Sequence, residues 1–300
     1  MKRFIINILL FFAIAAVVDL CVGLTGDYLQ VHAMGGETKK TNDLVMNDCH
    51  DIVVFGSSRA AHHYDTPFLS DSLGLDVYNA GYDGNGVILS YGLLSMILER
   101  YNPKLIVYDV EPSFDIVEYS ADNAHKRYIS TLKPYYRRQG VAEVIKDVSK
   151  EEWYKSHFGM MRYNTTIITK AMDAISGGKT ADKGFVPMSG EYSGAASNSS
   201  GNEFIIDPFK LNYIDKFLLL SKSKDVPVIV IASPKYGMVN SFDIIPVIEI
   251  CKKHNVPFID FYSDSVFMQH KEWFREPMHL NKKGARVFSE RIVDIIKDYK

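Results

Sequence analysis

The sequence predicts an α/β fold in which a mainly parallel sheet of about five strands is covered by helices on both faces. Two observations support it: short continuous apolar runs recur along the chain, and segments with a helical pattern lie between them. Continuous apolar runs indicate strands that are buried on both faces, as in parallel sheets. With 47% hydrophobic and 23% charged residues, the composition is that of an ordinary globular protein.

The expected strands are rich in Val, Ile and Phe, and each is followed by a segment expected to be helical. The strands are 51–55, 76–78, 104–110, 227–232 and 257–261. The helices are near 59–72, 87–100, 209–224, 241–254 and 281–297. Strands that alternate with helices predict a three-layer α/β/α sandwich over residues 51–300.

A long insertion at about 115–208 separates the third strand from the fourth. Residues 141–149 and 151–174 are expected to be helical, whereas 176–203 is rich in Gly, Ser, Ala and Asn and is expected to form a loop. Ligands of open α/β sheets bind at the carboxyl ends of the strands. We therefore expect the insertion to form a helical lid over that end.

The N-terminus carries the pattern of a membrane anchor. Lys2 and Arg3 precede an apolar stretch from Phe4 to Leu24, which as a helix would be about 30 Å long, near the thickness of a bilayer core. Positive charge before the stretch favours an amino terminus that stays inside, with the rest of the chain exported. Residues 1–25 are thus expected to be an anchor or signal sequence, and 26–50 a polar linker.

Two alternatives to the anchor stay open. The first is a cleaved signal peptide with a small-residue site at Ala13-Ile14-Ala15, and the second is a buried core helix. The apolar stretch continues well past the alanines, which favours the anchor over cleavage. Its place at the start of the chain, behind two basic residues, argues against a core helix.

Charge and cysteine content argue against a nucleic-acid-binding protein and against a cysteine metal site. The net charge is −2 and no basic stripe is present, so no nucleic-acid partner is expected. The three cysteines do not have the spacing of metal ligands, and no metal site or cofactor is expected. A Cys49–Cys251 disulfide is conceivable in an oxidising compartment, but two free thiols are the preferred interpretation.

Two short motifs could carry chemistry. Gly56-Ser57-Ser58 ends the first strand and begins a helix, whose N-terminus favours negative charge and can present a serine hydroxyl. The simpler interpretation is a serine that only caps the helix. Glu276 stands three residues before His279, ahead of the last helix, where a carboxylate can orient an imidazole as in a catalytic triad. A surface histidine beside a solvated carboxylate is the alternative.

Together the motifs resemble the SGNH (GDSL-like) hydrolase superfamily, whose fold is a flavodoxin-like sandwich. Its first block is similar to Gly56-Ser57-Ser58, its second to the run from Asn79 to Gly84, and its last to Glu276-Pro277-Met278-His279. The resemblance implies a nucleophile at Ser58, a base at His279 and an acid at Glu276. It also implies an oxyanion hole from the backbone N–H groups of Ser58 and Gly84, and a substrate contact at Asn79.

The chain departs from the family pattern in its third block. Where the family has Gly-x-Asn-Asp, this chain has Val110-Glu111-Pro112-Ser113, so the oxyanion-hole Asn is absent and Ser113 is the candidate nearest to its place. The loss of one such donor can cost roughly a hundred- to a thousandfold in rate. The final acid is Glu276 in place of the family's Asp, one methylene longer.

Other residues near these motifs have two interpretations each. Arg59 could meet an anionic group of a substrate, although a surface or helix-start arginine is the simpler interpretation. His62 and His63 are expected on a helix surface. An aromatic and basic cluster in the insertion could be a platform for a sugar or an acyl carrier, or part of a packed lid. Its members are Tyr128, Tyr135, Tyr136, Arg137 and Arg138.

The resemblance implies serine-dependent acyl transfer or ester hydrolysis on an extracytoplasmic carbohydrate, with acetyl as the acyl group. The expected partners are an acylated carbohydrate or other small molecule, a membrane reached through the N-terminal helix, and a multi-pass membrane acyl donor. Two alternatives remain: a carbohydrate esterase that only removes acyl groups, and a non-catalytic binding or assembly protein that keeps the fold.

Overall fold

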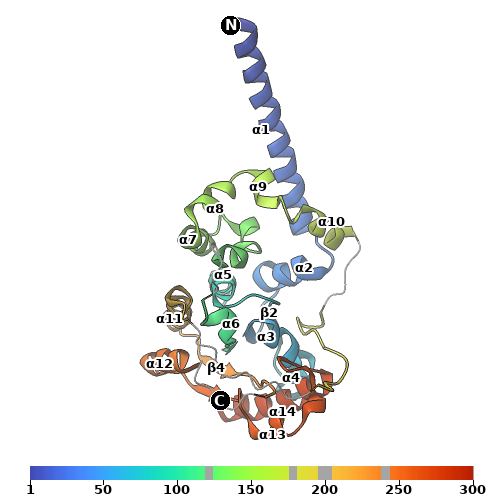
Figure 1. Cartoon of the computed structure of the whole chain (residues 1–300), viewed down its shortest axis with the longest axis vertical. Helices are drawn as coiled ribbons and strands as arrows, with labels where there is room; N and C mark the ends of the chain where they lie inside the picture. The colour runs from blue at the N-terminus through green and yellow to red at the C-terminus, as the bar shows by residue number, and fades with distance from the viewer. Residues whose placement is uncertain (119–123, 176–180, 195–204, 238–243, 300) are drawn as a thin grey trace. The chain divides into compact units, whose positions relative to one another are not determined.

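The computed structural model describes residues 1–118, 124–175, 181–194, 205–237 and 244–299 (Figure 1). The chain divides into two compact units. The smaller unit comprises Met1–Asp43 and Ile129–Thr180, and the larger comprises Leu44–Tyr128 and Ala181–Lys300. Half of the expected insertion thus groups with the N-terminal helix.

The larger unit is built on a parallel five-stranded sheet in the order β2-β1-β3-β4-β5. The strands are β1 (Ile52–Gly56), β2 (Val77–Gly81), β3 (Leu105–Asp109), β4 (Val228–Ala232) and β5 (Phe258–Asp260). All five expected strands are present. The chain runs outward from β1 to β2 and then returns to β3 on the other side of β1. This change of direction between β1 and β3 is the point where open α/β sheets bind ligands.

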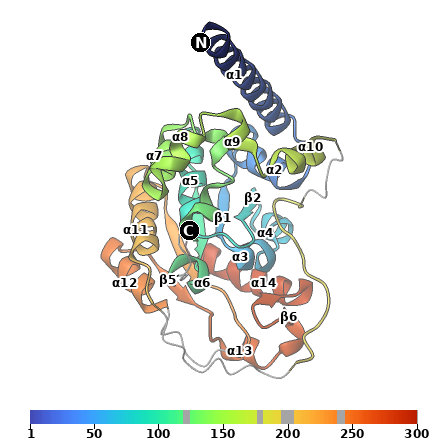
Figure 2. The same ribbon diagram turned by 45° about the horizontal axis from the view of Figure 1, so that its top comes forward.

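Helices cover both faces of this sheet, which confirms the three-layer fold. One layer holds α3 (Ser58–His63), α4 (Thr66–Leu73) and α14 (Lys282–Tyr299). The other holds α5 (Val87–Leu98), α11 (Pro208–Ser223) and α12 (Ile245–His254). Figures 1 and 2 show α11 and α12 together, on the opposite side of this unit from α4 and α14. Two short helices, α6 (Pro112–Asp115) and α13 (Ser265–Met268), complete the unit.

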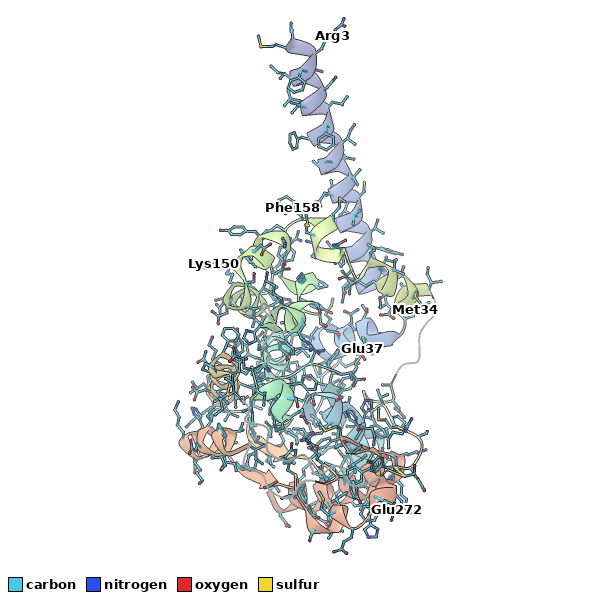
Figure 3. All side chains as sticks on the ribbon, viewed as in Figure 1. Arg3, Met34, Glu37, Lys150, Phe158 and Glu272 are labelled. Carbon is cyan, nitrogen blue, oxygen red and sulfur yellow. The ribbon has the colours of Figure 1, made fainter. Side chains whose placement is uncertain are left out.

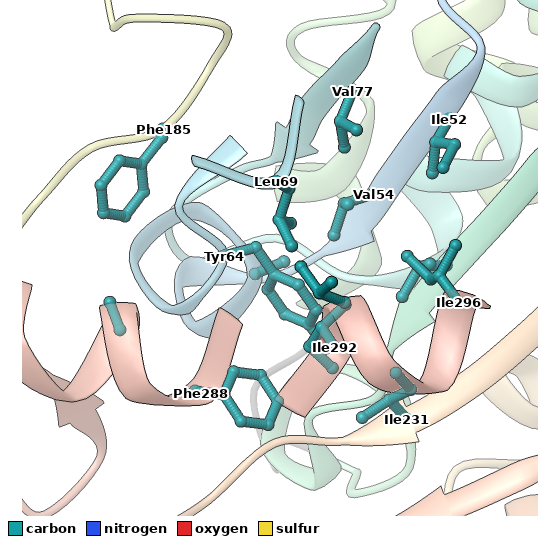
Figure 4. Close-up of a cluster of buried hydrophobic side chains, with 14 of the residues drawn as sticks. Ile52, Val54, Tyr64, Leu69, Val77, Phe185, Ile231, Phe288, Ile292 and Ile296 are labelled. Carbon is teal, nitrogen blue, oxygen red and sulfur yellow. The ribbon is translucent and has the colours of Figure 1, made fainter. Parts of the chain in front are cut away.

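The main core lies between the sheet and α14. Alternate residues of β1, Ile52 and Val54, point to this side, and Phe288, Ile292 and Ile296 of α14 face them (Figure 4). The spacing of four residues on α14 places its three side chains on one helical face. On the other face of the sheet, the ring of Phe55 packs against Phe217 of α11 at a centroid distance of 5.4 Å.

A two-stranded antiparallel ribbon precedes α14. It consists of β6 (Phe274–Glu276) and β7 (His279–Leu280), and Glu276 pairs with His279. The sequence analysis did not predict this ribbon, because two strands of three and two residues leave no periodicity to read.

The smaller unit is helical. Its helices are α1 (Lys2–Val31), α2 (Gly36–Asn42), α7 (Gln139–Val148), α8 (Lys150–Lys155), α9 (Gly159–Tyr163) and α10 (Ile167–Ile175), with a 3-10 turn at Lys133–Tyr135. A π-helical turn at Asp43–Asn47 and a 3-10 turn at Ala124–Ile129 span the boundaries between the units. The stretch 26–50, expected as a linker, is largely helical, and the expected helix 151–174 is three short helices.

The loop expected at 176–203 lies only partly within the described residues. Residues 181–194 contain no helix and only an isolated bridge between Asp182 and Phe185. Cys49 and Cys251 are free thiols, in agreement with the preferred interpretation. Among the described residues, α1 is long and apolar enough to cross a membrane, a test that an N-terminal signal sequence also passes.

We predict that Ile292→Ala lowers the free energy of unfolding by about 2–5 kcal/mol, because it leaves a cavity beneath the sheet. The side chain of Ile292 is fully buried, whereas the neighbouring Arg291 is exposed. Arg291→Ala should therefore change stability by less than about 0.5 kcal/mol. Denaturant unfolding of the full chain in detergent measures both. Equal losses in the two variants would contradict this description of the core.

Candidate active site

Ser58 is held at the carboxyl end of β1 by a tight turn. Gly56 has a φ of +145°, and a Cβ at this position would lie 2.5 Å from the carbonyl oxygen of Asp109, so only glycine fits. The Ser57 side chain then caps α3 by accepting a hydrogen bond from the backbone N–H of Arg59 at 3.3 Å. Since Ser57 serves as the cap, Ser58 is the first helical residue and its backbone N–H has no acceptor within the helix.

The ribbon before α14 brings His279 to Ser58. Nε2 of His279 lies 2.7 Å from Oγ of Ser58, although the two residues are 221 positions apart. Nδ1 of His279 is hydrogen-bonded to Oε1 of Glu276, and Oε2 of Glu276 accepts from the backbone N–H of Met278 at 3.0 Å. Ser58, His279 and Glu276 thus form one continuous chain of hydrogen bonds.

The partners of His279 fix its tautomer. An ionised carboxylate can only accept, so Nδ1 carries the proton and Nε2 of the neutral ring is free to accept from the Ser58 hydroxyl. Partial burial alone would raise the pKa of Glu276. The hydrogen bonds from His279 and from the Met278 N–H outweigh this effect, and the net pKa lies below the usual 4.5. Glu276 is therefore ionised at neutral pH.

Asn79 lies inside the fold, not at a substrate surface. It is fully buried, and its amide nitrogen donates to the carbonyl oxygens of Ala60 at 2.7 Å and Tyr64 at 3.2 Å. Its Oδ1 accepts from the backbone N–H of Gly81 at 2.9 Å. The expected substrate contact is thus replaced by a positioning role, in which Asn79 ties α3 to the end of β2.

Arg59 is also fully buried. It lies at the start of α3, as one interpretation expected, but it is neither exposed to a substrate nor on the surface. Nε of Arg59 lies 2.9 Å from Oε2 of Glu111, and Nη2 donates to the carbonyl oxygen of Val110 at 2.8 Å. Burial opposes the charge of Arg59, but the nearby carboxylates of Glu111 and Asp109 raise its pKa overall. The residue after Ser58 therefore anchors α3 to the end of β3.

The segment after β3 shows what stands where the resemblance expects an oxyanion-hole Asn. Glu111 is buried there and turned toward Arg59, and its Oε1 accepts from the backbone N–H of Ser113 at 3.2 Å. The Ser113 N–H is thus already bonded, and only its hydroxyl could serve the expected role. Gly84 lies in a left-handed conformation with φ of +66°, and its carbonyl oxygen accepts from Arg127 at 2.7 Å.

His62 and His63 are buried, which corrects their expected place on a helix surface. Nδ1 of His62 lies 2.6 Å from the carbonyl oxygen of Val186, and its ring is 5.4 Å from that of His279. Nε2 of His63 accepts from the backbone N–H of Leu280 at 3.0 Å, directly beside His279. α3 therefore contacts the ribbon through both histidines as well as through Ser58.

Behind His63 lies a buried polar chain that the sequence analysis missed. Nδ1 of His63 donates to Oγ of Ser233 at 3.0 Å, and this hydroxyl donates to Oδ2 of Asp109 at 2.8 Å. Burial and the positive charge of Arg59 hold the pKa of His63 well below its usual 6.5, so its ring is neutral. Asp109 and Ser233 end β3 and follow β4, and their position at the carboxyl ends of strands was the available signal.

The tyrosines of the aromatic and basic cluster are packed inside. Tyr128, Tyr135 and Tyr136 are all buried, and the Tyr135 hydroxyl donates to Oδ1 of Asn42 at 2.7 Å. Burial favours a packing role over an exposed platform. Within the ranges that the structure describes, no three His, Cys, Asp or Glu side chains gather as metal ligands would.

No family model matches the chain, and no curated protein matches it. Among the solved structures that the chain matches is the crystal structure of an acetyl xylan esterase, AlAXEase. It is 13% identical, with a TM-score of 0.41, and the match covers 82% of this chain and 99% of that one. A likeness of this degree is too distant to assign an activity to this chain.

We predict that Asp109→Asn changes how stability depends on pH. Burial raises the pKa of Asp109 from the usual 3.8 to about 7, although Arg59 and the hydrogen bonds from Ser233 partly offset it. Because the native carboxyl binds its proton more tightly than the unfolded one, the wild type loses stability as the pH rises from about 4 to about 7. The Asn variant lacks this loss, which amounts to at most ~4 kcal/mol.

Thermal unfolding of the full chain at pH 5 and pH 8 measures the effect. The wild type should lose stability relative to Asp109→Asn between the two pH values. An unchanged or opposite difference would show that Asp109 is ionised throughout this range.

Proposed function

We propose that this protein is a serine-dependent enzyme of ester chemistry, related to the SGNH hydrolases, in which Ser58 is the nucleophile. The observation that carries the proposal is the hydrogen-bonded chain from Ser58 through His279 to Glu276. Its members come from α3 and from the ribbon, two elements far apart in sequence. Nucleophile, base and orienting acid in hydrogen-bond reach are the geometry of an activated serine.

The first half of the reaction forms an acyl-enzyme. Oγ of Ser58 attacks the ester carbonyl carbon while Nε2 of His279 takes the hydroxyl proton. The tetrahedral intermediate collapses, the ester C–O bond breaks, and His279 returns the proton to the leaving alcohol. Glu276 holds the Nδ1–H of His279 throughout and stabilises the imidazolium. In the second half, His279 takes a proton from water or a sugar hydroxyl as that oxygen attacks the acyl carbon. The bond between the acyl carbon and Oγ of Ser58 then breaks, and His279 returns the proton to Oγ.

The oxyanion would be held by backbone N–H groups. The N–H of Ser58, at the start of α3, is one donor, and the resemblance assigns a second to Gly84. The Asn of the family's third block is replaced by Glu111, which binds Arg59. We therefore expect a slower reaction than in a relative that keeps this Asn, unless the Ser113 hydroxyl supplies the third donor.

The substrate and compartment follow from the resemblance and from α1. An apolar N-terminal helix behind Lys2 and Arg3 supports a chain anchored in a membrane with its larger unit on the extracytoplasmic face. We propose an acylated carbohydrate of the cell envelope as the substrate, with acetyl as the acyl group. A transferase would receive this group from a multi-pass membrane donor, with residues of the insertion excluding water as a lid. An esterase would use the same residues and release it to water.

We predict that a fluorophosphonate probe labels the full-length wild type and that Ser58→Ala abolishes the labelling. Ser57→Ala is the matched control, because Ser57 is the neighbouring hydroxyl but only caps α3. This variant should keep its labelling and lose about 1 kcal/mol of stability. Labelled and unlabelled species are separated on a gel. An unlabelled but folded wild type would instead support the binding-protein alternative.

We also predict that Glu276→Gln slows ester hydrolysis by up to about 10⁴-fold without loss of fold. A glutamine can offer its NH₂ to Nδ1 of His279, which favours the wrong tautomer and leaves Nε2 unable to accept from Ser58. Steady-state rates on a chromogenic acetyl ester measure the loss. Rates that match the wild type would remove Glu276 from the mechanism.

Addition of a sugar acceptor to the same assay distinguishes transfer from hydrolysis, because only transfer forms an acetylated sugar.

A further inference from the structure

Within the smaller unit, α9 is fixed to the side of α1. Both carboxylate oxygens of Asp19 accept from the start of α9: Oδ2 from the backbone N–H of Gly159 at 3.0 Å, and Oδ1 from that of Met160 at 2.8 Å. Asp19 would be costly inside an apolar helix if it were unpaired. Here it supplies acceptors for N–H groups that a helix start leaves open.

Close packing continues along α1 below Asp19. A Cβ on Gly159 would lie 2.4 Å from Cα of Gly23, so the two backbones touch through glycines. One turn further, Asp27 accepts from the Tyr163 hydroxyl at 2.5 Å and pairs with Arg162 at 3.2 Å. Residues 19–27 of α1 are therefore packed against α9, and these contacts fix the position of α9 along the axis of α1.

A largely apolar groove of about 650 Å³ lies between α1 on one side and α8 and α9, with the turn that joins them, on the other. On the α1 side it is lined by Phe12, Ala15 and Ala16. On the other side it is lined by four exposed side chains, Tyr154, Phe158, Met160 and Met161. Three charged residues, Asp19, Glu151 and Lys155, also line it. Figure 3 shows Phe158 beside α1, at the point where the helix leaves the rest of the smaller unit, and Arg3 near its opposite end.

The position of the groove along the axis of α1 sets its depth in a bilayer that α1 spans. A hydrocarbon core of about 30 Å takes up about 20 helical residues, so a span that begins at Phe4 extends past Asp19. Phe12, Ala15 and Ala16 then lie well inside the hydrocarbon. Side chains that line the same groove must lie at a similar depth. Little water would be present there, which fits the apolar side chains of the groove. The charged side chains that line it are paired: Asp19 with the N–H groups at the start of α9, and Lys155 with Glu151.

We propose that the segment from Tyr154 to Met161 is a second membrane contact, immersed in the lipid leaflet on the side where α1 ends. The ligand class is the acyl chains of bilayer lipids, which fill the groove beside α1. Lys155, which lines the groove, pairs with Glu151 at 2.6 Å and with Glu152 at 3.2 Å, and Tyr154 adds an aromatic ring of the kind enriched at membrane interfaces. This contact would fix the tilt and rotation of the smaller unit on the membrane.

This inference rests on the proposal that α1 crosses a membrane, and the experiment separates the two. The full chain is placed in phosphatidylcholine nanodiscs with or without brominated acyl chains, which quench tryptophan on contact. The background carries Trp153→Phe and Trp273→Phe, and one tryptophan is then added at Phe158 or at Met161. Phe11→Trp, on an exposed position of α1, is the control for the span. Leu219→Trp, an exposed apolar position on α11, is the control outside the smaller unit.

We expect brominated lipid to quench Phe158→Trp and Met161→Trp to an extent comparable with Phe11→Trp, and to leave Leu219→Trp unchanged. Quenching at Phe11→Trp alone would overturn the second contact and leave the span intact. No quenching at any position would overturn both. Circular dichroism of each variant checks the helical content. If the variant at 158 or at 161 misfolds, the other still gives the test.

Discussion

The proposed reaction depends on the way α3 is clamped between the sheet and the short ribbon. The hydrogen bond from Ser58 to His279 joins two segments that are far apart in the sequence, and one hydrogen bond of this kind contributes only about 1 kcal/mol. The second bond, from the Leu280 N–H to His63, lies one residue further along the ribbon and five residues further along α3. Because both bonds form between the same two elements, each makes the other less costly in conformational entropy.

Charged groups buried behind Ser58 hold the start of α3 in place. Arg59, Glu111 and Asp109 meet at the carboxyl ends of β1 and β3, where the sheet order reverses. A buried ion pair is not a strong source of stability, because desolvation offsets much of the attraction. It is, however, directional, and removal of one partner leaves an uncompensated charge. Its proposed value here is geometric: Arg59 cannot turn toward a substrate, and the adjacent Ser58 is held at the surface of the site.

The sequence was sufficient for the sheet, and it singled out the residues that meet in the candidate site, but it did not predict the surroundings of those residues. Apolar runs such as 104–110 report burial directly, and each expected strand is present. Ser58 and His279 were found from local motifs at strand and helix ends. Three residues were misplaced because the partners that bury them are distant in the sequence. Arg59 meets Glu111, His62 meets Val186, and Asn79 meets Ala60. The prediction of one helix over 151–174 was wrong for a local reason, since Ser156, Gly159 and Asn164 interrupt the helical pattern.

Asp19 has two opposite effects on the N-terminal helix. In the sequence it interrupts an apolar stretch, at a cost that is tolerable close to the membrane interface. In the folded chain both of its oxygens accept hydrogen bonds from α9, so the residue that weakens the apolar stretch also helps to attach α9 to α1. Cleavage near Ala15 would leave this attachment but remove Phe12, so the groove beside α1 would lose one wall. An uncleaved α1 is therefore the form in which every contact of this unit is kept.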